Sequence, residues 1–415
     1  MKRLTLLSVC LLLSASLLWP VRAPVVTAAP PPDLAEYLGR NAQELTVTNG
    51  QLGGPAAALL RAEGARAQFV FVGEEHGIAE IPQFTAALWR ALVPQGYRHI
   101  ALEEGPWITA QADRYVRFGD TEARQTYRAS VVPLLEFASE EHFAFFDALR
   151  QTAHEQKSPM IWGLDQEMRA VPLLRRLLAL ARTRAERRAV QTILDRAMRA
   201  DKPGKSTLVG YADDIAALRR AFGPQPAPET GQIIAAMEIS NRIYENDQRA
   251  GKELTGYEAN REREDMMKDI FLRNYRAAQR AGERRPRVLL QLGAWHGMRG
   301  LSPTRVSSLG NFAAEFARGE GSQMFNLAVT CGRGGRRSGT NEDAGKELPC
   351  GADEAEWAQP LLKAARWPWT LFDLRPLRPV VHAGLVKPPE PLASLVFQYD
   401  ALLIIAGTTP VHYAR

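Results

Sequence analysis

The chain has 415 residues, of which 46% are hydrophobic, and it carries a formal net charge of +6. This length and apolar content allow a large buried core, which excludes a tail or a linker. Lys2, Arg3 and Arg22 fall within residues 1–28, which hold no acidic residue, so removal of this segment lowers the charge from +6 to +3. We therefore expect no nucleic-acid partner.

The first residues have the order of a secretory signal. Lys2 and Arg3 precede an apolar run at residues 4–18, and small residues follow at 26–29. The run is short for a bilayer span, so we expect residues 1–28 to be a signal peptide. The mature protein is then secreted or periplasmic in a bacterium, with no stable membrane span. An uncleaved N-terminal anchor is the alternative.

The folded domain is expected over residues 37–415. Before it, proline and alanine dominate residues 29–36, which predicts a disordered lead-in. The first strong pattern inside the domain is an apolar run at residues 68–73 that ends on Glu74 and His76. An apolar run that stops on polar residues and glycine predicts a buried strand whose carboxyl end opens into a loop.

The same pattern of an apolar strand with a polar ending returns three times. The later endings are Glu103 and Glu104 after residues 97–102, Asp165 after residues 160–164, and His296 after residues 288–293. In open α/β sheets, ligands bind at the carboxyl ends of the strands. The chain therefore returns to one candidate site several times.

Helical patterns separate these strands. They occupy residues 81–92, the segment from Trp107 onward and residues 137–149, and further strands are predicted at 325–330 and 401–405. Strands that alternate with helices predict an α/β fold with a mostly parallel sheet covered by helices on both faces. We expect residues 170–280 to form a helical cap or insertion that shields the site and shapes its pocket.

The polar endings supply the parts of a general acid–base site. Histidine titrates near neutrality and is the natural base, while carboxylates hold its tautomer or act as acids. An arginine can receive developing negative charge. The predicted catalytic residues are Glu74, His76, Glu103 and His296, and the supporting residues are Glu104, Asp165, Arg263 and Arg299. The alternative for each residue alone is an ordinary loop position or helix cap.

A divalent metal is a second use for the same side chains. Histidine and carboxylates suit zinc or manganese, but the chain has no compact H-E-x-x-H motif, so the sequence leaves the cofactor open. His99 falls inside the second strand, and we expect it to be a packed core histidine or an edge histidine.

Two cysteines remain after the signal, Cys331 and Cys350. In an oxidising compartment they predict one disulfide across a glycine- and arginine-rich loop, with a stabilisation of about 3 kcal/mol in the chain-entropy model. Two unpaired thiols are the alternative. Neither cysteine lies near a histidine in the sequence, so we expect no cysteine nucleophile.

The ordered motifs resemble those of the erythromycin esterase-like family and the wider Tiki, TraB and ChaN-like superfamily. The matching segments are residues 73–77 (GEEHG), 100–105 (IALEEG), 163–165 (GLD), 263–267 (REDMM) and 293–296 (GAWH), the last followed by Arg299. The resemblance covers roughly residues 68–300. It implies an α/β fold with a site made of Glu74, His76, Glu103 and His296.

For function, the resemblance implies a hydrolase in which His76 activates water against an ester, lactone or amide of a small-molecule substrate. The family's esterases tend to carry two histidines near the late strand, whereas this chain carries His296 and has arginine at position 299. The resemblance therefore leaves hydrolysis open, but it does not imply a macrolide substrate. The alternatives are a ChaN-like uptake protein that binds haem or a metal without catalysis, and an inactive interaction module; no C-x-x-C-H haem attachment sequence is present.

Overall fold

The computed structural model describes residues 33–131, 138–153, 156–201, 208–249, 256–338, 345–351 and 355–413. The predicted signal peptide lies outside the described residues. The predicted disordered lead-in at 29–36 is wrong at its end, because residues 34–36 belong to the helix α1, Leu34–Arg40. Leu38 of α1 is fully buried in an apolar cluster with Leu361, and this burial orders the segment.

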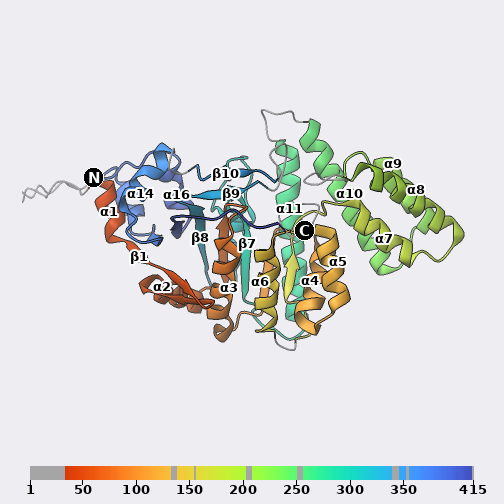
Figure 1. The fold of residues 1–415 in the computed structure, drawn as a ribbon, viewed down its shortest axis with the longest axis horizontal. Coiled ribbons are helices and arrows are strands. Elements are labelled where there is room, and N and C mark those ends of the chain that lie inside the picture. Colours follow the sequence, from red (N-terminus) through yellow and green to blue (C-terminus); the bar gives the residue numbers. More distant parts are fainter. Residues whose placement is uncertain are drawn as a thin grey trace, which may run out of the picture.

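An eight-stranded sheet forms the centre of the fold, with the strand order β1-β11-β12-β8-β4-β7-β5-β6 (Figure 1). In chain order its strands are β1 Ala42–Glu44, β4 Phe69–Glu74, β5 His99–Leu102, β6 Ile161–Gly163, β7 Val288–Gly293, β8 Met324–Cys331, β11 Trp369–Asp373 and β12 Ala401–Ile405. The strands from β12 to β6 are parallel, and β11 runs antiparallel to both of its neighbours. The predicted mostly parallel sheet is confirmed.

Helices cover both faces of this sheet. The side chains of β4 alternate between two apolar cores: Val70 and Val72 pack in the core that holds Phe84 and Trp89 of α3, Glu80–Leu92. Phe69 and Phe71 pack in the core that α11, Tyr257–Arg280, and α13, Leu309–Gly319, supply. Because strand side chains point to opposite faces in turn, an uninterrupted apolar run is what a strand buried on both faces requires.

The remaining helices lie outside the region predicted as a cap. They are α2 Pro55–Arg66, α4 Pro106–Phe118, α5 Thr121–Val131, α6 Glu140–Arg150, α12 Ala294–Gly297, α14 Gln359–Ala364, α15 Leu377–His382 and α16 Leu392–Gln398, with short 3-10 turns at Val93–Gln95 and Glu356–Ala358. No helix in the described part of the chain has both the length and the apolar character needed to cross a membrane.

In its described part, the region predicted as a cap consists of helices joined by loops. Four helices, α7 Ala170–Leu180, α8 Arg184–Ala200, α9 Ala212–Phe222 and α10 Pro228–Arg249, lie together at one end of the molecule (Figure 1). The residues that they bury, such as Leu174 and Leu218, form a core separate from those that pack against the sheet. The fifth helix, α11, leaves this group and buries Phe271 against the sheet.

Small antiparallel pairs lie outside the main sheet. One joins β2, Thr46–Thr48, to β3, Gln51–Gly53, and the other joins β9, Gly335–Arg337, to β10, Glu347–Pro349. The predicted disulfide between Cys331 and Cys350 is present, and it closes the chain around the β9–β10 hairpin. A structural disulfide is typical of proteins in oxidising compartments.

Candidate active site

The carboxyl ends of three neighbouring strands carry the predicted catalytic residues. Glu74 ends β4, Glu103 follows β5, and His296 lies in the short helix after β7. Strand β7 pairs in parallel with both β4 and β5, so the three ends lie at one edge of the sheet. His76 follows Glu74 in the next loop. This topology brings together side chains that lie more than 200 residues apart in the sequence.

His76 lies between two carboxylates. Its Nδ1 is 3.1 Å from Oε1 of Glu74, and its Nε2 is 3.5 Å from Oε2 of Glu103. Gln291 donates from Nε2 to the other oxygen of Glu74 at 3.2 Å. The side chain of His76 is 29% exposed, whereas those of Glu74 and Glu103 are 10% and 9% exposed. Glu74 therefore fixes the imidazole orientation from a nearly buried position.

Glu103 is the centre of the constellation. Its Oε2 accepts a 2.5 Å hydrogen bond from the backbone N–H of Gly293, and its Oε1 accepts one of 2.7 Å from Nη2 of Arg263. Burial by itself would raise the pKa of Glu103, but the positive charges of His296, His76 and Arg263 outweigh burial and hold that pKa well below its usual range. Glu103 is therefore an anion at neutral pH.

His296 is a buried cation that binds two carboxylates. Its Nε2 lies 3.2 Å from Glu103, and its Nδ1 lies 2.7 Å from Glu264. Burial alone favours the neutral ring, but Glu103 and Glu264 together raise the pKa of His296 from 6.5 to about 9. The second oxygen of Glu264 accepts the backbone N–H of Leu309 at the start of α13 at 2.7 Å. His296 thus stabilises the charge of Glu103.

The raised pKa of His296 predicts a loss of stability in mildly alkaline solution. The folded protein holds this proton more tightly than the unfolded chain, so the stabilisation is complete below pH 6.5 and disappears as the pH rises through about 9. The loss amounts to at most about 3 kcal/mol. Urea denaturation at pH 6, 7.5 and 9.5 measures this loss in the free energy of unfolding.

The variant Glu264→Gln removes one of the two carboxylates that raise the pKa of His296. We therefore expect its free energy of unfolding to decline at a lower pH than that of the wild type. The same pH dependence in both proteins would show that the loss does not come from His296.

Arg263 links Glu103 to Asp165. Its Nε and Nη2 lie 2.9 Å and 2.5 Å from the two oxygens of Asp165, and Nη2 also donates to Glu103. The side chain of Arg263 is 25% exposed. Within the described residues, Nη1 of Arg263 has no hydrogen-bond partner, so its two protons remain available to a bound molecule.

A cavity of about 320 Å³ opens on these groups. Its lining combines the sheet edge with helices of the region predicted as a cap. The lining residues are His76, Glu103, Asp165, Gln166, Met168, Ile243, Tyr244, Asp247, Ala259, Asn260 and Arg263. The outer wall comes from α10 and the start of α11, so these two helices determine which molecules fit.

Two predicted supporting residues lie elsewhere. Glu104 points away from Glu103: its carboxylate accepts from the hydroxyl of Tyr127 at 2.8 Å and lies 2.9 Å from Nε2 of His142. Arg299 pairs with Asp400 through contacts of 2.8 Å and 2.6 Å. Asp400 immediately precedes β12, so Arg299 lies toward the opposite edge of the sheet, where the parallel strands begin. Neither residue contacts the His76 constellation.

Two residues of the constellation escaped the sequence prediction. Glu264 lies in the same helical motif as Arg263, but only Arg263 was predicted as a site residue. Gln291 lies inside β7, where it is the polar residue of a buried run and holds Glu74. A polar side chain inside a strand buried on both faces was the available signal. The prediction for His99 is confirmed, since its side chain is fully buried.

The geometry does not match a resident metal site. Within the described residues, no group of three or more histidine, cysteine or carboxylate side chains is arranged to hold a metal ion. The carboxylates are instead matched to arginine, imidazole and backbone N–H donors, which are the ordinary partners of buried anions.

Comparison with known proteins identifies the fold. No family model matches the chain, and no curated protein matches it. Similar solved structures include a succinoglycan biosynthesis protein (TM-score 0.61, 14% identity, 91% of this chain and 97% of that chain). A Bacillus cereus protein is similar with a TM-score of 0.58 and 16% identity, over 92% of this chain and 98% of that chain. The erythromycin esterase mutant EreC in its open conformation is similar with a TM-score of 0.56 and 13% identity, over 85% of this chain and 94% of that chain.

The chain shares the fold of these three proteins. The similarity extends over 94–98% of the length of each of them. The TM-scores of 0.56–0.61 establish a common architecture. At identities of 13–16% they establish nothing about activity, since one fold hosts many chemistries. The fold relationship implied by the sequence motifs is therefore supported, and the activity has to be argued from the site.

Proposed function

We propose that the protein is a hydrolase in which His76 activates water against the carbonyl of an ester, lactone or amide. The observation that carries the proposal is the placement of His76 at the cavity wall with a carboxylate beside each ring nitrogen. A general base needs an oriented imidazole and groups that stabilise its protonated form. Glu74 and Glu103 meet both needs.

The proton movements follow from this geometry. Nδ1–H of His76 donates to Glu74, so Nε2 carries the lone pair that takes a proton from water. Glu103 lies 3.5 Å from Nε2, which is longer than an ordinary hydrogen bond, and its charge stabilises the imidazolium that forms. The water oxygen bonds to the carbonyl carbon, the bond to the leaving group breaks, and His76 returns the proton to that group.

Arg263 is the candidate for stabilising the oxyanion. It lines the cavity, and its Nη1 protons are not used by Asp165 or Glu103. Those two carboxylates fix the guanidinium plane before a substrate arrives, so little reorganisation is needed as negative charge develops. His296 has both ring nitrogens on carboxylates and lies outside the cavity lining, so it acts by holding Glu103 rather than by touching the substrate.

Haem binding fits the cavity poorly. Haem needs an apolar slot and an axial ligand. The lining holds three carboxylates and a guanidinium, from Glu103, Asp165, Asp247 and Arg263, so it is not an apolar slot. We therefore favour the hydrolase over the uptake protein.

A substrate panel tests the proposed function. Purified full-length protein is incubated with esters, lactones and amides in ¹⁸O-labelled water, with and without a chelator. We expect at least one ester or lactone to give an acid product that carries the label, with a rate unaffected by the chelator. The matched variant His76→Gln is expected to be inactive on the same compound. Hydrolysis that is equal in both proteins would overturn the role of His76, and absence of hydrolysis across the panel would overturn the function.

Substitution of Arg263 by lysine tests the oxyanion role separately. Lysine keeps the positive charge beside Asp165 but lacks the planar fork and the two Nη1 protons. We expect kcat to fall by about 10²-fold, the usual effect of losing one oxyanion donor, with a smaller change in KM. Steady-state kinetics on the best panel substrate measures both values. A change confined to KM would assign Arg263 to substrate binding instead.

A further inference from the structure

Both chain neighbours of His76 are bound to the segment that the disulfide closes. This segment runs from the end of β8 through the β9–β10 hairpin to Cys350. Glu75 contacts it through its side chain, and Gly77 contacts it through its backbone. The position of the candidate base is therefore defined from both sides by the same element.

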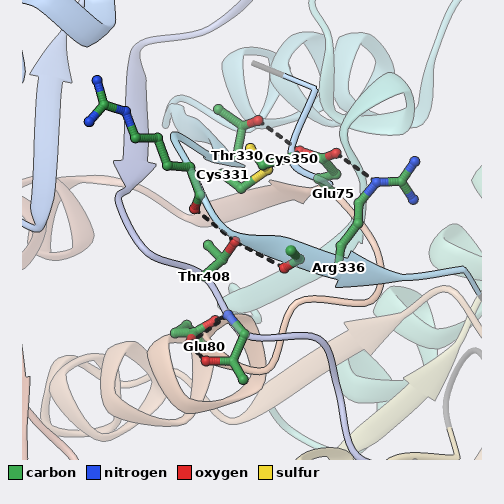
Figure 2. Close-up of a disulfide and its surroundings, with 10 residues drawn as sticks. Glu75, Glu80, Thr330, Cys331, Arg336, Cys350 and Thr408 are labelled. Carbon is green, nitrogen blue, oxygen red and sulfur yellow. Dashed lines mark hydrogen bonds and ion pairs between the residues drawn. A yellow bond between two sulfur atoms is a disulfide. The ribbon is translucent and has the colours of Figure 1, made fainter. Parts of the chain in front are cut away.

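Glu75 makes the contacts on the first side. Its Oε2 accepts a 2.8 Å hydrogen bond from the hydroxyl of Thr330, and its Oε1 lies 3.1 Å from Nε of Arg336 on β9. Figure 2 shows Glu75 between Thr330 and Arg336, beside the disulfide. The Sγ of Cys331 lies 3.6 Å from the same carboxylate. The side chain that points away from the constellation thus connects His76 to the disulfide.

Gly77 makes the contacts on the second side. Its carbonyl accepts hydrogen bonds from the backbone N–H of Arg337 at 2.9 Å and of Val411 at 3.1 Å. Gly77 has a φ of +85°, and a Cβ at this position would lie 1.9 Å from the carbonyl oxygen of Arg337. The hairpin can approach the loop this closely only because the residue is glycine.

The disulfide joins this hairpin to the sheet. Cys331 ends β8, which pairs directly with β4, and Cys350 follows β10. Both cysteines are buried. The hairpin has only three residues in each strand, and an isolated two-stranded hairpin of this size is marginally stable in water. The covalent link therefore adds to the few hydrogen bonds between β9 and β10 and to the contact with Thr408, whose carbonyl accepts from the backbone N–H of Gly335 at 3.0 Å.

We infer that Glu75 is a positioning residue for His76 and that the Cys331–Cys350 disulfide makes the activity of the site depend on the redox state. This inference rests on the proposed hydrolase function. In the oxidised protein, Arg336 and Arg337 hold residues 75–77 against the β9–β10 hairpin, which the disulfide ties to the end of β8. In the reduced protein the hairpin separates more easily from the loop, and His76 is held less tightly at the cavity.

The redox step is a two-electron thiol–disulfide exchange. A dithiol reductant transfers two electrons and two protons to the disulfide, which gives the thiols of Cys331 and Cys350 and the cyclic disulfide of the reductant. No other bond changes. Activity is then greatest in the oxidising compartment where this disulfide persists.

Reduction of the full-length protein with dithiothreitol tests the inference. Thiol titration confirms two free thiols, and kinetics is then compared with the oxidised protein. We expect kcat to fall by about tenfold or more, since a small displacement of a catalytic group has this effect, with KM changed by less than about twofold. Glu75→Gln, which keeps the side-chain size but loses the charge that pairs with Arg336, is expected to lower kcat in the same way without reduction.

Glu347→Gln is the matched control. Glu347 pairs with Arg337 on the exposed side of the same hairpin, with no contact to residues 74–77 among its described interactions. We expect its kcat to match the wild type. If reduction unfolds the protein, as judged by near-UV circular dichroism, the comparison of Glu75→Gln with Glu347→Gln decides. Equal kcat values for these two variants would then overturn the inference.

A second readout is independent of activity. NMR compares the imidazole C2–H signal of His76 in the oxidised and reduced proteins. The signal is assigned by its loss in His76→Gln, and the signal of the exposed His382 serves as the reference. We expect the His76 signal to move or broaden on reduction. An unchanged signal overturns the inference, even where kcat falls. If no panel substrate is hydrolysed, the proposed function fails, and this signal alone decides whether the disulfide positions His76.

Discussion

Replacement of Glu103 by glutamine is expected to lower the free energy of unfolding by about 3 kcal/mol, because it removes the anion of a buried charge cluster. One oxygen of Glu103 accepts from Arg263 and contacts His296, and the other accepts from the N–H of Gly293. Whichever way a glutamine amide turns, its NH₂ group faces a donor. The variant therefore loses a charge and gains a donor–donor conflict in a nearly buried position.

Urea denaturation at pH 7 measures this effect, and Glu283→Gln is the matched control. Glu283 also binds a buried histidine, at 2.9 Å from His99, but its side chain is 27% exposed. The Nδ1 of His99 also lies 2.8 Å from the carbonyl oxygen of Pro159, and this contact does not involve Glu283. We expect a loss of about 1 kcal/mol or less for the control. A loss this small for Glu103→Gln would mean that the charge cluster contributes little to the free energy of unfolding.

The common edge of the constellation could be predicted because parallel strands end on the same side of a sheet. The apolar runs before Glu74, Glu103 and His296 correspond to β4, β5 and β7, which are adjacent in the strand order β4-β7-β5. Strands β1 and β11 were missed. They form the antiparallel edge, and β1 has only three residues, AQE, without an apolar alternation.

The directions of individual side chains could not be predicted in the same way. Glu103 and Glu104 are consecutive, yet one meets Arg263 and the other meets Tyr127, because successive side chains of an extended chain point to opposite sides. Arg299 follows His296 by three residues, but the chain turns back after α12 and carries it to Asp400. Helical periodicity gives the buried face of α11 without showing that Glu264 reaches His296.

The region around His76 also depends on contacts between distant segments. Residues 330–337 and 411 hold the loop, and nothing in the local sequence GEEHG indicates these partners. The predicted disulfide was the only sign of this arrangement, since it places the end of β8 beside a hairpin. Tertiary contacts of this kind decide whether a histidine after a strand is a base with fixed orientation or an ordinary loop residue.

Replacement of His76 by glutamine is expected to have the largest effect on catalysis and a small effect on stability. The imidazole supplies the base, so its loss should lower kcat by about 10²–10⁴-fold, the range typical of general base catalysis. Glutamine can still donate to Glu74, and the His76 side chain is 29% exposed, so the free energy of unfolding should change by less than about 1 kcal/mol.

Steady-state kinetics and urea denaturation on the same preparations separate these effects, and His382→Gln, at an exposed position, is the control for the exchange of residue types. Retention of at least half of the wild-type kcat in His76→Gln would remove His76 from the reaction. The base would then have to be sought among the other cavity groups. Glu103 is the weaker candidate, because its pKa lies well below its usual range and an anion stabilised by the positive charges of His296 and Arg263 takes up a proton poorly. His76 alone in the constellation combines an oriented ring, partial exposure and carboxylates that stabilise its protonated form.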